Sequence, residues 1–216
     1  MATTDPFVQR VRSVLAPELR AQGFAGRFPT FRRLQSELIH EVSVQGWRYG
    51  GQRTVNLSFG FTFIQPKHAD PKAPETEYTY RIGTSSGRGR WWKYGSASEE
   101  EAIALADDMI EVFRAEAPDF FQRFKAFPES FVHFTAQDFV EAPPSYLPPR
   151  IGLAADAGRP IDGARAIARD CWVFMHLWLH LGDEARARKF AETGLQHVGK
   201  AWGLGLDFRR VLGLSS

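Results

Sequence analysis

The chain has 216 residues, with 27 lysines and arginines against 25 aspartates and glutamates, 44% hydrophobic residues and a single cysteine. A chain of this length can bury roughly 70% of its unfolded surface, so it needs no metal or disulfide to fold. One cysteine excludes an internal disulfide framework and favours a reducing compartment, so we expect a cytoplasmic protein. The first residues lack a basic stretch followed by an apolar one, so we expect no secretory signal. The most apolar stretch, residues 171–181, has about half the length of a bilayer crossing, which excludes membrane insertion.

The charges are unevenly distributed along the chain. Residues 42–98 carry eight bases and three acids, whereas residues 99–141 carry eleven acids and three bases. A locally positive segment can steer an anionic partner. The alternative is that the two segments neutralise each other across a packed interface.

The first predicted element is an amphipathic helix from Asp5 to about Gly23. Its apolar residues recur every four positions, and an Asp followed by a Pro suits a helix start. Pro17 has no amide proton for the helical ladder, so we expect it to kink or restart the helix.

The period of the apolar residues then changes to two, which predicts strands over 28–34, 38–47 and 53–64. Gly50 and Gly51 suit a hairpin, so the last two of these strands should be antiparallel neighbours. The third strand places its apolar side chains on one face: Val55, Leu57, Phe59, Phe61 and Phe63. Its other face carries Thr54, Asn56, Ser58, Gly60 and Thr62. We expect the apolar face to pack against helices and the polar face to be accessible.

A fourth strand is predicted over 77–83, and residues 91–94 are a candidate fifth. Ser98 and Glu101 then have the spacing of a capping box, which starts a second helix. Its apolar stripe continues to about Glu116, and we expect Pro118 to end it. Phe120, Phe121 and Phe124 then suggest a short helical continuation packed on the same core.

The remaining sequence predicts a connector and a helical hairpin. Prolines are frequent between 126 and 160, where regular patterns fade. A helix after Asp162 and a second over 184–198 are separated by a Gly-Asp turn, and a short helix over 206–212 follows.

Part of this pattern resembles the bacterial domain of unknown function 4304 family. The resembling segments are LAPELRAQGF at 15–24, VSVQGW at 42–47, VNLSFGF at 55–61, the Trp91-Trp92 pair and APDFF at 117–121. Together they cover about residues 5–125. The resemblance implies a bacterial cytoplasmic protein with an α+β domain, in which a helix packs on an antiparallel sheet, and it implies no established activity. Residues 126–216 lie outside it.

The segment SSGRGRWWK at 85–93 is the first candidate binding element. Its glycines would let backbone amides approach an anion, and its tryptophans could stack on a base or an apolar partner. It has no Gly-Lys-Ser/Thr sequence and therefore matches no phosphate-binding loop. The alternative is a flexible hairpin followed by one buried and one rim tryptophan. The candidate residues here are Arg88, Arg90, Trp91 and Trp92.

The polar face of the sheet is the second candidate. Gln45, Asn56 and Arg81 share this face if the strand register allows, with Trp47 and Trp91 beside them. Aromatic residues and arginine concentrate the binding energy of protein interfaces, so this face could dock a partner. The alternative is simple solvent exposure of one face of an antiparallel sheet.

No catalytic or metal-binding pattern is found. His176 and His180 lie one turn apart, but no third ligand accompanies them, so we expect a half-buried pair on an aromatic helix. His40 alternates with apolar residues and should border the core, satisfied by a hydrogen bond. Cys171 lies in an apolar stripe without a nearby cation, so we expect an unreactive thiol. We predict no catalytic residue, no metal site and no cofactor.

These patterns predict an α+β protein with an antiparallel sheet of four or five strands packed on an N-terminal and a central helix, plus a C-terminal helical hairpin. We expect an α+β domain over 1–125, a Pro-rich connector over 126–160 and the hairpin over 161–216.

The leading functional hypothesis is a non-catalytic bacterial factor that binds another protein, with an immunity or antitoxin-like role as one form of it. The alternative is a binder of nucleic acid or a phosphorylated small molecule through the basic Gly/Arg/Trp loop. A third class is a hydrolase that uses His40 or His176 with carboxylates brought together from distant segments.

Overall fold

The structure of the protein is a computed structural model. It describes residues 5–47, 50–64, 78–83, 90–141, 163–199 and 202–215. These residues form two compact units. The first contains the described residues up to Thr62 together with Tyr78–Ser130. Phe63, Ile64 and the described residues from Phe131 onward belong to the second.

The first unit is built on an antiparallel sheet in the order β1-β2-β3-β4-β5, with β6 also paired to β4. Its strands are β1 (Ala25–Arg27), β2 (Thr30–Gln35), β3 (Leu38–Gly46), β4 (Gln52–Phe61), β5 (Tyr78–Arg81) and β6 (Trp92–Lys93). The predicted antiparallel sheet is confirmed, and β1 adds a strand that the sequence did not predict. Both β5 and β6 pair with β4, at Asn56–Phe59 and at Gln52–Arg53 respectively.

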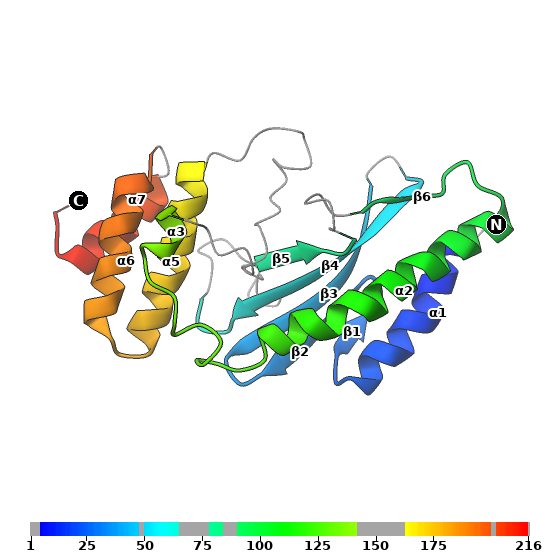
Figure 1. The fold of residues 1–216 in the computed structure, drawn as a ribbon, viewed down its shortest axis with the longest axis horizontal. Coiled ribbons are helices and arrows are strands. Elements are labelled where there is room, and N and C mark those ends of the chain that lie inside the picture. Colours follow the sequence, from blue (N-terminus) through cyan, green and yellow to red (C-terminus); the bar gives the residue numbers. More distant parts are fainter. Residues whose placement is uncertain are drawn as a thin grey trace. The chain divides into compact units, whose positions relative to one another are not determined.

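Two helices lie side by side against one face of this sheet, α1 (Pro6–Ala21) and α2 (Glu99–Arg123) (Figure 1). We call this side of the sheet the helix face. Phe59 of β4 points to it and contacts the rings of Phe120 and Phe124. The predicted apolar face of β4 therefore forms the core.

Both helices begin as their sequences predict. The Asp5 side chain accepts the backbone N–H of Val8 and caps α1. Ser98 and Glu101 form the reciprocal hydrogen bonds of a capping box at the start of α2. These caps satisfy amides that have no partner within the helix.

The prediction that Pro118 ends the second helix is wrong. Pro17 does not restart α1, and the predicted kink at Pro17 stays a prediction. The helix α1 runs unbroken through Pro17, and α2 runs through Pro118 to Arg123. A proline inside a helix costs about 3 kcal/mol. Beyond Pro118, the buried Phe120 and Phe121 offset this cost, because burying one such side chain contributes about 2 kcal/mol.

The expectation of an accessible polar face along β4 is also wrong. Thr54 is 0% exposed, Ser58 2% and Asn56 8%, so β4 is buried on both faces. The predicted strand also ends earlier than expected, at Phe61. Phe63 belongs to the second unit, where its ring stacks on that of His180 with the centroids 4.0 Å apart.

The second unit is helical, with α3 (Asp138–Glu141), α5 (Gly163–His180), α6 (Glu184–His197) and α7 (Trp202–Leu212). The helices α5 and α6 form the predicted hairpin around a turn at Gly182. Residues 131–141, which the sequence assigns to the connector, contribute to this unit's core. Phe139, for example, contacts the rings of Phe174 and Phe190. The rest of the predicted connector, residues 142–160, lies outside the described residues.

Within the parts of the chain that the structure describes, every helix is too short or too polar to cross a membrane.

Candidate functional site

Strand register brings several predicted site residues together on the face of the sheet opposite the helix face, which we call the second face. Asn56 of β4 pairs with Ser43 of β3 on one side and with Arg81 of β5 on the other. Gln45 lies two residues beyond Ser43 and therefore shares its face. Five predicted residues form one group, the Trp-Arg-amide cluster: Gln45, Trp47, Asn56, Arg81 and Trp91.

The two amides and the guanidinium of this cluster are joined by hydrogen bonds. The Asn56 Nδ2 donates to Gln45 Oε1 at 2.9 Å. Arg81 makes two longer contacts of 3.4 Å, from Nε to Asn56 Oδ1 and from Nη2 to Gln45 Oε1. Arg81 is 6% exposed, so its charge lies almost wholly within the protein. A buried guanidinium needs such acceptors, because an unsatisfied buried charge is strongly destabilising.

The two tryptophans complete the cluster. The guanidinium carbon of Arg81 lies 4.8 Å from the centre of the Trp91 ring, a cation–π arrangement. Trp47 meets Trp91 edge to face with the ring centres 5.7 Å apart. Both tryptophans are half-buried.

Two other predicted residues lie on the helix face instead. Trp92 is 1% exposed, and its Nε1 donates to Asp108 Oδ2 on α2 at 2.6 Å. Arg90 forms an ion pair with the same carboxylate oxygen at 2.6 Å and lies over the Trp92 ring. Successive strand residues point to opposite faces, so Trp91 alone of this trio reaches the second face. Trp92 cannot contact a partner, and Arg88 lies outside the described residues.

A second carboxylate of α2 holds β5. Glu116 Oε2 accepts the Tyr80 hydroxyl at 2.9 Å and the backbone N–H of Gly83 at 2.9 Å. Sequence reasoning missed both Asp108 and Glu116 as individual residues. The feature of the sequence that could have pointed to them is the change from a basic segment over 42–98 to an acidic one over 99–141. The Arg90–Asp108 ion pair supports the alternative that these two segments neutralise each other.

His40 is positioned as a structural residue, as expected. It is 0% exposed, its Nε2 donates to the backbone oxygen of Phe124 at 2.7 Å, and its Nδ1 accepts from Arg33 Nη2 at 3.1 Å. Burial lowers the pKa of His40 from 6.5 to about 4, an effect opposed by the Phe124 hydrogen bond and reinforced by the charge of Arg33. Both ring nitrogens are occupied, so His40 cannot serve as a base in this conformation.

The histidines of α5 contact aromatic rings. His176 is half-buried with its ring 4.4 Å from that of Trp172, and His180 stacks on Phe63. Across the described ranges, no group of three or more His, Cys, Asp or Glu side chains could hold a metal ion. Burial raises the pKa of the Cys171 thiol to about 12, with a smaller contribution from the charge of Asp170. The expected unreactive thiol is consistent with this direction.

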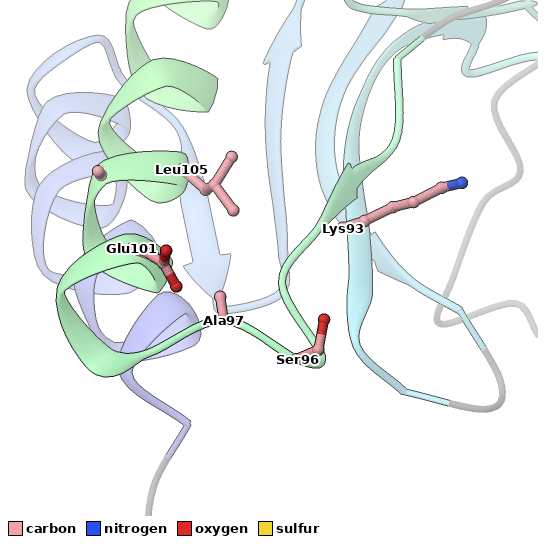
Figure 2. Close-up of a pocket in the computed structure, with 6 residues that line it drawn as sticks. Lys93, Ser96, Ala97, Glu101 and Leu105 are labelled. Carbon is pink, nitrogen blue, oxygen red and sulfur yellow. The ribbon is translucent and has the colours of Figure 1, made fainter.

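A shallow hollow of about 580 Å³ lies between β6 and the first turns of α2. Figure 2 shows Glu101 and Leu105 on α2 facing Ala97, while the Lys93 side chain extends away from them. The Glu101 carboxylate already accepts the N–H of Ser98 at 2.8 Å. The groups of an active site converge on a common point, and the charged groups of this hollow do not.

Comparison with known proteins places these features in a family. A family model described as "Domain of unknown function (DUF4304)" matches residues 15–123. The match contains β1 to β6, the C-terminal part of α1 from Leu15 onward and all of α2, and thus every residue of the Trp-Arg-amide cluster. No curated protein and no solved structure matches the chain. The chain belongs to the family of the domain of unknown function DUF4304.

Proposed function

We propose that the chain is a non-catalytic factor that binds another protein through the Trp-Arg-amide cluster. The observation that carries this proposal is the contact of Trp47 with Trp91 above a buried, hydrogen-bonded Arg81. Tryptophan and arginine dominate the binding energy of protein interfaces, especially where neighbouring groups hold them in place. The amides and the guanidinium restrict the Trp91 ring before a partner arrives, which lowers the entropy lost on binding.

The distribution of charge favours a protein over a nucleic acid. Of the basic residues in the predicted loop, Arg90 is neutralised by Asp108 on the helix face. Three glutamates occupy the first turn of α2, and one of them, Glu101, lines the same hollow as Lys93. A phosphate backbone requires several accessible cations, and nearby carboxylates repel it.

The proposed cellular setting is the cytoplasm of a bacterium, with an immunity or antitoxin-like role as one form of the function. The single cysteine, which is buried, supports a reducing compartment.

The proposal is tested with the purified full chain as bait. Proteins captured from lysate are identified, and each candidate is then purified and titrated against the wild type, Trp91→Ala and Arg123→Ala. Arg123 is exposed on α2 and forms an ion pair with Asp119 one turn earlier on the same helix, so it is the control. Loss of a central tryptophan costs about 2 kcal/mol or more, so Trp91→Ala should weaken binding by about 30-fold.

Equal affinity of the wild type and Trp91→Ala would remove the cluster from the binding site. The same proteins are titrated with a labelled oligonucleotide at low salt. Binding that falls steeply as salt is added, because phosphate contacts release counterions, would support the nucleic-acid alternative instead.

A further inference from the structure

Two carboxylates of α2 hold, from the helix face, the strand residues next to the Trp-Arg-amide cluster. Asp108 accepts the Trp92 indole N–H and pairs with Arg90, so it binds the residues on both sides of Trp91. Glu116 accepts the Tyr80 hydroxyl and the Gly83 N–H, so it binds on both sides of Arg81. The two carboxylates lie eight residues apart, or about two helical turns.

The two attachments are joined at the backbone. The N–H of Arg90 donates to the carbonyl of Ile82 at 2.9 Å, and a β-carbon at Gly83 would lie 2.6 Å from Cβ of Arg90. Residues 82–83 and Arg90 are therefore in close contact, with one carboxylate of α2 attached to each side of that contact.

The alternation of side chains along a strand links a contact on the helix face to the direction of side chains on the second face. In a strand, a residue whose two neighbours are fixed on one face can project only to the other face. Tyr80 and Trp92 are held on the helix face. Arg81 follows Tyr80 in β5 and therefore projects to the second face, and Trp91, directly before β6, stacks on it there.

We propose that Asp108 and Glu116 are positioning residues of the Trp-Arg-amide cluster: they set the orientation of Trp91 and Arg81 from the opposite side of the sheet. The inference that this orientation serves to bind a partner rests on the proposed function. The positioning itself does not, because it is a property of the chain without a partner.

The Asp108 arm uses the neighbouring residue as its control. Asp107 is half-exposed and pairs with Arg10 of α1, so Asp107→Ala removes an acidic side chain of the same size from the next position. The full chain is labelled with 5-fluorotryptophan, and the Trp91 fluorine resonance is assigned by Trp91→Phe. Asp108→Ala should shift the Trp91 resonance as well as that of Trp92, whereas Asp107→Ala should shift neither.

Asp108→Asn distinguishes positioning from charge. The asparagine oxygen can still accept the Trp92 indole N–H, although it loses the ion pair with Arg90. That ion pair is nearly half exposed on both partners, and such pairs contribute little. We therefore expect Asp108→Asn to restore the wild-type Trp91 resonance.

The Glu116 arm uses amide exchange. Glu116→Ala leaves the Gly83 N–H without its acceptor, so exchange at Gly83 should become at least tenfold faster, and the Trp91 resonance should shift. Glu116→Gln keeps an acceptor oxygen and should restore both readings. Glu111→Ala, on an exposed part of the same helix, should match the wild type.

A Trp91 resonance that stays in place in both Asp108→Ala and Glu116→Ala, while the Trp92 resonance or Gly83 exchange changes, would overturn the proposal. The two faces of the sheet would then be independent. Because no partner is used, the positioning can hold even when the titrations described above reject the cluster as a binding site.

Discussion

The ring of Phe208 in α7 lies directly against the backbone of Gly194 in α6. A β-carbon at position 194 would lie 2.6 Å from Cε1 of Phe208, which is closer than carbon atoms approach. Phe208 is 0% exposed, so it cannot move aside without repacking its neighbours. Gly194 therefore allows α6 and α7 to pack at this distance.

Gly194→Ala should destabilise the second unit by about 2 kcal/mol, the usual cost of overpacking a core. Helix propensity alone would predict the opposite sign, because alanine is favoured over glycine by about 1 kcal/mol within a helix. Urea unfolding followed by circular dichroism measures the change.

Gly203→Ala is the matched control for this prediction, since nothing lies within 4 Å of its added β-carbon. It should be stabilising by about 0.5 kcal/mol through the reduced entropy of the unfolded chain. A gain of similar size in both variants would show that Phe208 does not restrict position 194.

His40 should make folding stability depend on pH in acid. Its pKa is about 4 in the folded protein against the ordinary histidine value of 6.5, so the unfolded chain takes up the proton first as the pH falls. The associated stability is complete above pH 6.5, decreases between pH 6.5 and 4, and is then constant. The full loss amounts to about 3 kcal/mol.

The measurement is urea unfolding at pH 7, 5.5 and 4.5 for the wild type, His40→Gln and His133→Gln. His40→Gln should be less stable at pH 7 and should lose most of the pH dependence in this window. His133 is exposed, so His133→Gln should retain the wild-type slope. An unchanged slope in His40→Gln would assign the pH dependence to other groups.

Asn56→Ala should destabilise the first unit by about 2 kcal/mol. The Gln45 amide oxygen would lose the shorter of its two hydrogen bonds, and the buried Arg81 would lose an acceptor. Ser43→Ala, at the position of β3 that pairs with Asn56, is the control for loss of a polar group on the same face. Thermal unfolding compares the two variants, and equal melting temperatures would show that the amide network contributes nothing specific.

Cys171 should resist modification in the native protein. Burial raises the pKa of its thiol to about 12, and the side chain is 0% exposed, so neither the reactive thiolate nor access is available at pH 8. Reaction with a thiol reagent should be at least a hundredfold slower in buffer than in urea. Equal rates would mean that α5 opens readily.

The elements of this fold follow largely from local pattern. Alternation in residues 53–61 predicts β4 and its core face, and the spacing of Ser98 and Glu101 predicts the start of α2, because each depends on contacts within a few residues. The strand β1 was missed, since three exposed residues carry no alternation. The end of α2 was misplaced because the packing of Phe120 and Phe121 outweighs the local effect of Pro118.

The sequence by itself determined which residue types were available for a site and, as the alternative to a binding loop, indicated one buried and one rim tryptophan at positions 91 and 92. Only the tertiary structure decided which of them is buried, because that depends on Asp108, 16 residues later on another element. It also decided that the polar side chains of β4 are enclosed. Burial depends on every neighbour of a strand, whereas alternation reports only the direction in which its own side chains point.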